Sequence, residues 1–195
     1  MINLDERRIR RTKNALKMHF IALVKKKGYP AVTVTDIVEQ ADYNRSTFYA
    51  YYLDKEDLAN QLLEEMMLLL EESFRKPFEQ SKIVQYEHIE NRAQNTFFQH
   101  IFEYRHFYEL LMVAQTIPNL KDRFLEQFTN MFSNIHYLDA SKNIITIKRY
   151  NTYKMYGSYG IILDWIKNGC TESPVQLSAN MLTIFQTTSN SFRFI

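Results

Sequence analysis

Residues 44–52, NRSTFYAYY, combine side chains that can bind a polyanion with side chains that belong in a hydrophobic core. Arg45, Ser46 and Thr47 can hydrogen-bond to bases or phosphates, and four aromatic residues follow within the same nine positions. Such a segment can be core packing, a stacking platform for single-stranded nucleic acid, or a helix that binds double-stranded DNA. The four aromatic side chains cannot all face inward from one helix, which argues against core packing alone.

Two short helices are predicted around this segment. Thr33 with Asp36 three positions later is a capping box, which opens a helix that ends at Gln40 or Ala41. Asn44 is a preferred N-cap for the second helix. Two short helices joined by three or four residues are typical of a helix-turn-helix, whose second helix enters the major groove of DNA.

The spacing within the second helix assigns its faces. Phe48 and Tyr52 lie four positions apart and are expected to pack inward, whereas Tyr49 should point outward with its hydroxyl toward a phosphate. A single-strand stacking platform would normally lie on a sheet, and this segment has no strand pattern. The sequence therefore predicts a DNA-binding helix with one face toward the core.

Longer helices are expected on both sides of this pair. Apolar spacing predicts one helix over Arg7 to Lys27, and Asp54 with Asp57 caps another that ends before Pro77. Further helical patterns cover 82–104, 106–115, 119–137, 143–168 and 175–190, although the β-branched stretch 144–150 allows a strand. With four glycines and four prolines in 195 residues, an all-α fold is expected.

Composition excludes several classes of function. No run of 18 apolar residues is present, so no membrane partner is expected, and a single cysteine, Cys170, fits a reducing, cytoplasmic setting. Glycine-rich phosphate loops, nucleophile elbows and metal-ligand spacings are missing from the sequence, which predicts no enzyme activity, no cofactor and no metal. The first 27 residues carry nine basic side chains against two acidic ones, which favours an anionic partner.

Residues 9–66 resemble the DNA-binding domain of the TetR family of transcriptional regulators, through the pattern TVTDIVEQADYNRSTFYAYYLDKEDL. The resemblance implies an N-terminal helix-turn-helix domain over 1–54, and a C-terminal bundle over 55–195 for dimerisation and effector binding. Asp42 replaces the glycine that is usual in the turn, and aspartate tolerates the left-handed conformation. The DNA contacts that the resemblance implies are Thr33, Thr35, Tyr49 and Lys55 to phosphate, and Arg45, Ser46 and Thr47 to bases or adjoining backbone.

The segment 86–115 is rich in aromatic residues. One interpretation is the ordinary core of a helical bundle. The other, which the resemblance favours, is a pocket for a small apolar or aromatic effector. Its candidate residues are Phe98, Phe102, Tyr108 and Met112.

Two glycines interrupt an otherwise good helix at YGSYGIILDWIKNG, residues 156–169. Each costs about 1 kcal/mol relative to alanine, which indicates the close approach of another helix. The last two helices form the dimer interface in the TetR family, and this stretch also resembles the subgroup of dihydroxyacetone-kinase regulators. The expected interface residues are Gly157, Gly160, Ile161, Trp165, Met181 and Phe185.

The sequence as a whole predicts a homodimeric repressor that binds a palindromic operator in double-stranded DNA and is released by an effector. The alternative hypothesis is a DNA-binding regulator or adaptor that a protein partner controls, without a pocket for a small molecule.

Overall fold

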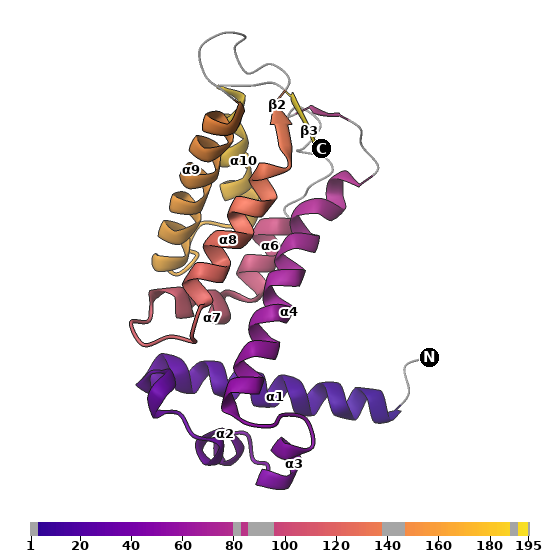
Figure 1. Ribbon diagram of the computed structural model, residues 1–195, viewed down its shortest axis with the longest axis vertical. Helices are drawn as coiled ribbons and strands as arrows, with labels where there is room; N and C mark the ends of the chain where they lie inside the picture. Colours follow the sequence, from indigo (N-terminus) through magenta and orange to yellow (C-terminus); the bar gives the residue numbers. More distant parts are fainter. Residues whose placement is uncertain (1–3, 80–82, 86–95, 138–146, 188–190, 195) are drawn as a thin grey trace. The chain divides into compact units, whose positions relative to one another are not determined.

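The structure is a computed structural model that describes residues 4–79, 83–85, 96–137, 147–187 and 191–194. Helices account for most of these residues (Figure 1). The α-helices are α1 (Leu4–Lys27), α2 (Val34–Gln40), α3 (Arg45–Tyr49), α4 (Lys55–Arg75), α6 (Thr96–Glu103), α7 (Arg105–Tyr108), α8 (Leu120–Ser133), α9 (Ile147–Lys167) and α10 (Pro174–Gln186). Short 3-10 helices are η1 (Tyr29–Ala31), η2 (Lys76–Phe78) and η4 (Glu109–Met112).

The predicted helical architecture is confirmed, with a helix-turn-helix in the N-terminal part and a helical C-terminal part. The chain also forms a small antiparallel sheet in the order β1-β3-β2, from β1 (Val84–Gln85), β2 (Ile135–Tyr137) and β3 (Ser191–Phe194). This sheet was not predicted. Its central strand, β3, pairs with two strands that lie more than 50 residues away in the sequence.

Three predicted boundaries change accordingly. The helices expected over 82–104 and 119–137 are wrong at 84–85 and 135–137, where the backbone pairs with β3 instead. The possible strand at 144–150 is wrong for 147–150, which open helix α9. The parts of the predictions that fall on 82, 86–95, 143–146 and 188–190 lie outside the described residues.

The chain divides into two compact units, one from residues 1–66 and 106–120, the other from 67–105 and 121–195. In the first unit, α1 buries Leu16, Phe20 and Val24 against the interior that α2, α3 and α4 complete. Among the described residues, no helix has the length and apolar composition that crossing a membrane requires.

Aromatic side chains dominate the interior of the second unit. Phe128 of α8 contacts the rings of Phe97, Phe124 and Tyr159 with centroid separations of 5.0–5.9 Å. Lys154 of α9 is also buried, and its ammonium donates to the carbonyl oxygen of Phe185 at 3.1 Å. Burial lowers the pKa of Lys154 to about 8.

One segment of the first unit comes from the middle of the chain. The backbone N–H of Tyr29 donates to the carbonyl of Gln115 at 2.8 Å, and Lys25 forms an ion pair with Glu109. Gly28 makes this approach possible, because its φ of 79° and ψ of 150° suit glycine almost exclusively. A Cβ on Gly28 would lie 2.9 Å from Oε1 of Gln115 and 3.1 Å from its Cβ.

Gly28→Ala should therefore destabilise the protein more than Gly169→Ala does. Gly169 also has a positive φ, 73°, but an added Cβ there meets nothing within 4 Å. We expect Gly28→Ala to lower the free energy of unfolding by about 3 kcal/mol, and Gly169→Ala to lower it by about 1 kcal/mol. Urea denaturation followed by circular dichroism measures both. Equal losses of unfolding free energy in the two variants would show that residues 106–120 move to accommodate a side chain at position 28 without cost.

Candidate nucleic-acid interface

The helix-turn-helix is built from local capping contacts that the sequence predicts. Thr33 caps α2 with the full capping box, since its side chain accepts from the N–H of Asp36 while Asp36 accepts from the N–H of Thr33. Asp42 occupies the turn with a φ of 56°, which confirms that it replaces the usual glycine in a left-handed conformation. Asn44 then caps α3 by accepting from the N–H of Thr47 at 2.8 Å.

Helix α3 is held by two aromatic anchors. Phe48 is completely buried and Tyr52 is 2% exposed, with their ring centroids 5.5 Å apart, which confirms that both pack inward. Tyr49 is 55% exposed, and its ring meets the edge of Phe48. The outward direction predicted for Tyr49 is thus confirmed, and its contact with phosphate stays a prediction.

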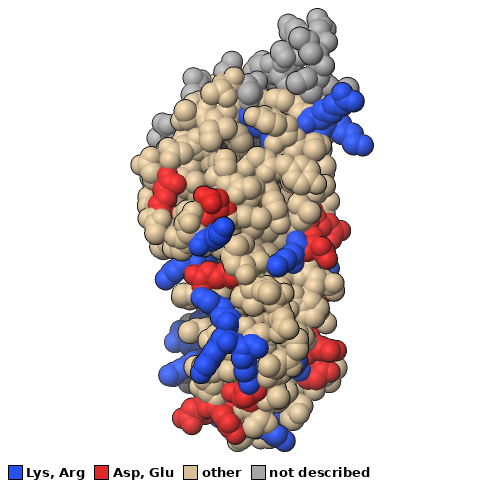
Figure 2. All heavy atoms as spheres, turned by 90° about the vertical axis from the view of Figure 1, so that its left-hand side faces the viewer, with Lys and Arg blue, Asp and Glu red and all other residues tan. Residues whose placement is uncertain are grey.

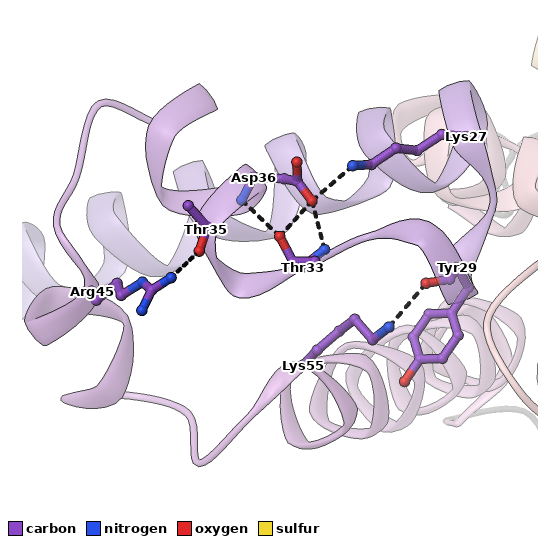
Figure 3. Close-up of polar contacts among 7 residues, drawn as sticks. All are labelled: Lys27, Tyr29, Thr33, Thr35, Asp36, Arg45 and Lys55. Carbon is purple, nitrogen blue, oxygen red and sulfur yellow. Dashed lines mark hydrogen bonds and ion pairs between the residues drawn. The ribbon is translucent and has the colours of Figure 1, made fainter.

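The predicted base-contacting residues lie together on the outside of α3. Arg45 and Ser46 are exposed and Thr47 is half-buried. The guanidinium of Arg45 reaches back to α2 and donates from Nη2 to Oγ1 of Thr35 (Figure 3). This bond links the two helices and uses Thr35 as an acceptor, so the hydroxyl proton of Thr35 points elsewhere.

Thr33 has a different environment. Its hydroxyl donates to Oδ2 of Asp36 at 2.6 Å, and its backbone N–H donates to the same oxygen at 2.7 Å. A phosphate contact donated by the Thr33 hydroxyl therefore requires its bond to Asp36 to break, whereas the capping box itself can persist. The ammonium of Lys27, at the end of α1, completes the cluster 2.7 Å from Asp36 (Figure 3). The pairing of Lys27 with Asp36 has no signal in the sequence, because the two residues lie on different helices.

The charge of Asp36 is stabilised by this cluster. Its bonds with Lys27 and then Thr33 lower the pKa of Asp36 from 3.8 to about 2. The carboxylate therefore stays ionised over the whole physiological pH range. The negative charge of Asp36 stabilises the N-terminal end of α2 through the helix dipole, and it neutralises the positive charge of Lys27.

Lys55 is tied to the first unit rather than extended into solvent. Its ammonium donates to the carbonyl oxygen of Tyr29 at 3.0 Å and lies 4.3 Å from the centroid of the Tyr29 ring (Figure 3). An ammonium has three donors, so this bond leaves two for a phosphate. The predicted role of Lys55 remains a prediction.

Further basic side chains line α1. Arg7, Arg8, Arg10 and Arg11 are all exposed. Lys13 lies 5.4 Å from the centroid of the Tyr52 ring, which places this part of α1 beside the segment that follows α3. Figure 2 shows one face of the molecule, in whose lower half basic side chains gather with acidic side chains between them.

The predicted effector residues fall into two groups. Phe98 and Phe102 of α6 contact Trp165 in the second unit, with ring centroids 6.3 and 6.5 Å apart. Tyr108 is buried in the first unit, and Met112, in the same unit, is 42% exposed. The structure therefore brings the two phenylalanines together and assigns Tyr108 and Met112 to the other unit.

The predicted interface residues also differ in exposure. Gly157 and Gly160 are exposed, and an added Cβ on either meets nothing within 4 Å. Ile161 and Phe185 are half-buried. Trp165 and Met181 are 5% and 4% exposed and line the interior of their own unit. Sequence spacing could not separate these residues, because both faces of α9 carry large apolar side chains.

Two family descriptions match the chain. “Bacterial regulatory proteins, tetR family” covers residues 21–62, and “Transcriptional regulator C-terminal region” covers 87–187, which is more than half of the sequence. A relative in Bacillus subtilis (strain 168), “Uncharacterized HTH-type transcriptional regulator YxbF”, is 35% identical over 60 residues. That match spans 30% of this chain and 16% of the relative.

Solved structures show the same fold over almost the whole chain. The “Dihydroxyacetone kinase operon activator DhaS” matches with a TM-score of 0.57 at 18% identity, over 90% of this chain and 94% of that one. The “transcriptional regulator FadR from Bacillus subtilis in complex with stearoyl-CoA” matches with a TM-score of 0.57 at 16% identity, over 87% and 95%. At these identities the likeness concerns the fold alone.

Proposed function

The chain belongs to the TetR family of transcriptional regulators, which are DNA-binding regulators and not enzymes, and we propose that it is a homodimeric repressor released from a palindromic operator by an effector. One observation carries this proposal: α3 holds a polar first turn outward, while Phe48 of the helix and Tyr52 just after it are anchored in the core. Residues 1–54 would bind DNA in the cytoplasm, and residues 55–195 would dimerise and respond to the effector.

The exposed groups of the helix-turn-helix suit both kinds of DNA contact. Arg45 carries donors that match the acceptor edge of guanine, and its bond to Thr35 pre-orients the guanidinium. Tyr49 extends from the exposed side of α3, where a hydroxyl can donate to a phosphate. In a symmetric dimer, two copies of α3 would enter successive major grooves, about 34–36 Å apart.

Replacing Arg45 and Tyr49 should separate base recognition from phosphate binding. On a duplex selected by the wild-type protein, we expect Arg45→Ala to lower affinity about 10- to 100-fold and to relax the preference at one base pair. Tyr49→Phe should lower affinity about two- to tenfold on every sequence, because it removes one phosphate hydrogen bond. Fluorescence anisotropy at fixed salt measures both variants.

Arg75→Ala is the matched control, since Arg75 is exposed on α4 but belongs to the second unit. It should leave the affinity for the selected duplex unchanged. Unchanged affinity in both Arg45→Ala and Tyr49→Phe would remove α3 from the proposed interface.

An exposed face of α9 supports the proposed homodimer. Tyr153 and Tyr156 are 66% and 55% exposed on the same side of the helix as Gly157 and Gly160. Large aromatic side chains next to glycine allow the helix of a second chain to approach closely, with a high contact area. Trp165 and Met181 would support this face from the interior.

Gly160→Arg should therefore break the dimer without unfolding the chain. Arginine is a better helix former than glycine by about 1 kcal/mol, so the isolated chain should keep its helix. We expect the dissociation constant of the dimer to rise at least about tenfold, because a charge would be buried between the chains. Sedimentation velocity measures this, with Thr129→Arg on the exposed side of α8 as control. A dimer that survives Gly160→Arg unchanged must use another surface.

One observation supports control by an apolar effector: FadR of Bacillus subtilis, which shares the fold, forms a complex with stearoyl-CoA. Residues 106–120 pack in the first unit, while the chain on both sides of them belongs to the second. A change in the second unit would therefore pull directly on the unit that contains α3. An effector would act by favouring dimers in which the separation of the two α3 helices no longer fits the operator.

The second candidate is control by a protein partner. It is favoured by the packing of Phe98 and Phe102 on Trp165, because a small molecule would have to separate rings that already stabilise the unit. Trp165 is the single tryptophan of the chain. Its fluorescence therefore reports directly whether an added molecule enters this cluster.

A further inference from the structure

The side-chain oxygen of Asn44 collects three hydrogen bonds at the start of α3. The backbone N–H of Thr47 lies 2.8 Å from Oδ1, the hydroxyl of Thr47 lies 2.9 Å from it, and the hydroxyl of Ser46 lies 2.6 Å from it. A backbone N–H can only donate, so the atom it meets must be the amide oxygen and not the amide nitrogen. This contact fixes the orientation of the Asn44 amide.

The same oxygen fixes the polarity of the two hydroxyls. An amide oxygen only accepts hydrogen bonds, so Ser46 and Thr47 must each direct their one hydroxyl proton toward Asn44. What each hydroxyl then offers to an outside molecule is its lone pairs. Since Ser46 is exposed and Thr47 half-buried, the first turn of α3 presents two acceptors beside the donors of Arg45.

Acceptors select among the groups that DNA exposes. Phosphate oxygens are acceptors themselves, so hydroxyls held in this way cannot donate to them while the Asn44 bonds persist. In the major groove, the donors are the N6 amino group of adenine and the N4 amino group of cytosine, whereas guanine and thymine present acceptors. The hydroxyls of Ser46 and Thr47 therefore match adenine or cytosine and not the phosphates of the DNA backbone.

We propose that Ser46 and Thr47 read each half-site by accepting hydrogen bonds from the exocyclic amino groups of adenine or cytosine, with Asn44 as the positioning residue that sets this preference. The proposal rests on the proposed function, in which α3 enters the major groove. Within one turn of helix, Arg45 would supply hydrogen-bond donors, and Ser46 and Thr47 would supply acceptors.

Base analogues without the amino group test this proposal. On the duplex selected by the wild-type protein, each adenine of a half-site is replaced in turn by purine, and each cytosine by pyrimidin-2-one. At one or more positions, we expect the wild-type affinity to fall about two- to tenfold. The variant Ser46→Ala/Thr47→Val should show no such extra loss there. The coupling is the difference between the losses of affinity that the analogue causes in the two proteins. Taking this difference cancels the effect of the analogue on the duplex itself.

Variants of Asn44 separate positioning from folding. Asn44→Asp keeps an acceptor for all three bonds, so it should retain the sensitivity to the missing amino group. Asn44→Gly removes the acceptor while glycine remains tolerated at an N-cap, so the sensitivity should be lost although circular dichroism shows an intact fold.

The outcomes distinguish this inference from the function beneath it. The inference is wrong if the protein binds a duplex specifically but no amino position is coupled to Ser46 or Thr47. The proposed function as a DNA-binding regulator would still hold in that case. Failure of the wild-type protein to select any sequence would instead overturn the proposed function.

Discussion

The anchoring of a five-residue helix is the constraint on which the proposed interface depends. A helix as short as α3 cannot persist by itself, because helix nucleation is unfavourable and isolated helices become stable only beyond about 12–15 residues. Its position comes from the burial of Phe48 and Tyr52 and from the Asn44 cap. Because two aromatic rings fix one face, the opposite face is presented to DNA in one orientation. Tyr49 can then sit in solvent without weakening the unit.

The capping bonds do more than end helices, since they also decide what the surface offers. The backbone N–H and the hydroxyl of Thr33 both donate to Asp36. The hydroxyl of Thr35 instead accepts from Arg45, so its own proton can be donated to another group. Side chains of the same chemical class therefore present opposite hydrogen-bonding faces a few residues apart. In the interface that we propose, the specificity of the turn would follow from this local bonding as much as from the identities of its residues.

Local features were predictable from the sequence because their causes are local. The capping box at Thr33, the left-handed Asp42 and the inward Phe48 each depend on residues within four positions. The small sheet was missed because β3 pairs with strands more than 50 residues distant, and two- to four-residue strands carry no pattern of their own. The same reason hid the bond between Tyr29 and Gln115, and the inward direction of Trp165. Residue types predicted which side chains could bind DNA. Only their contacts within the protein show which donors and acceptors remain available to DNA.

Recognition of a specific DNA sequence by two copies of α3 can be tested by selecting bound duplexes from a random pool at moderate salt. We expect enrichment of an inverted repeat whose half-sites lie about one helical turn apart, or a multiple of it. Retention of duplexes without any enriched sequence would contradict it, because the basic side chains of α1 would then supply only phosphate affinity.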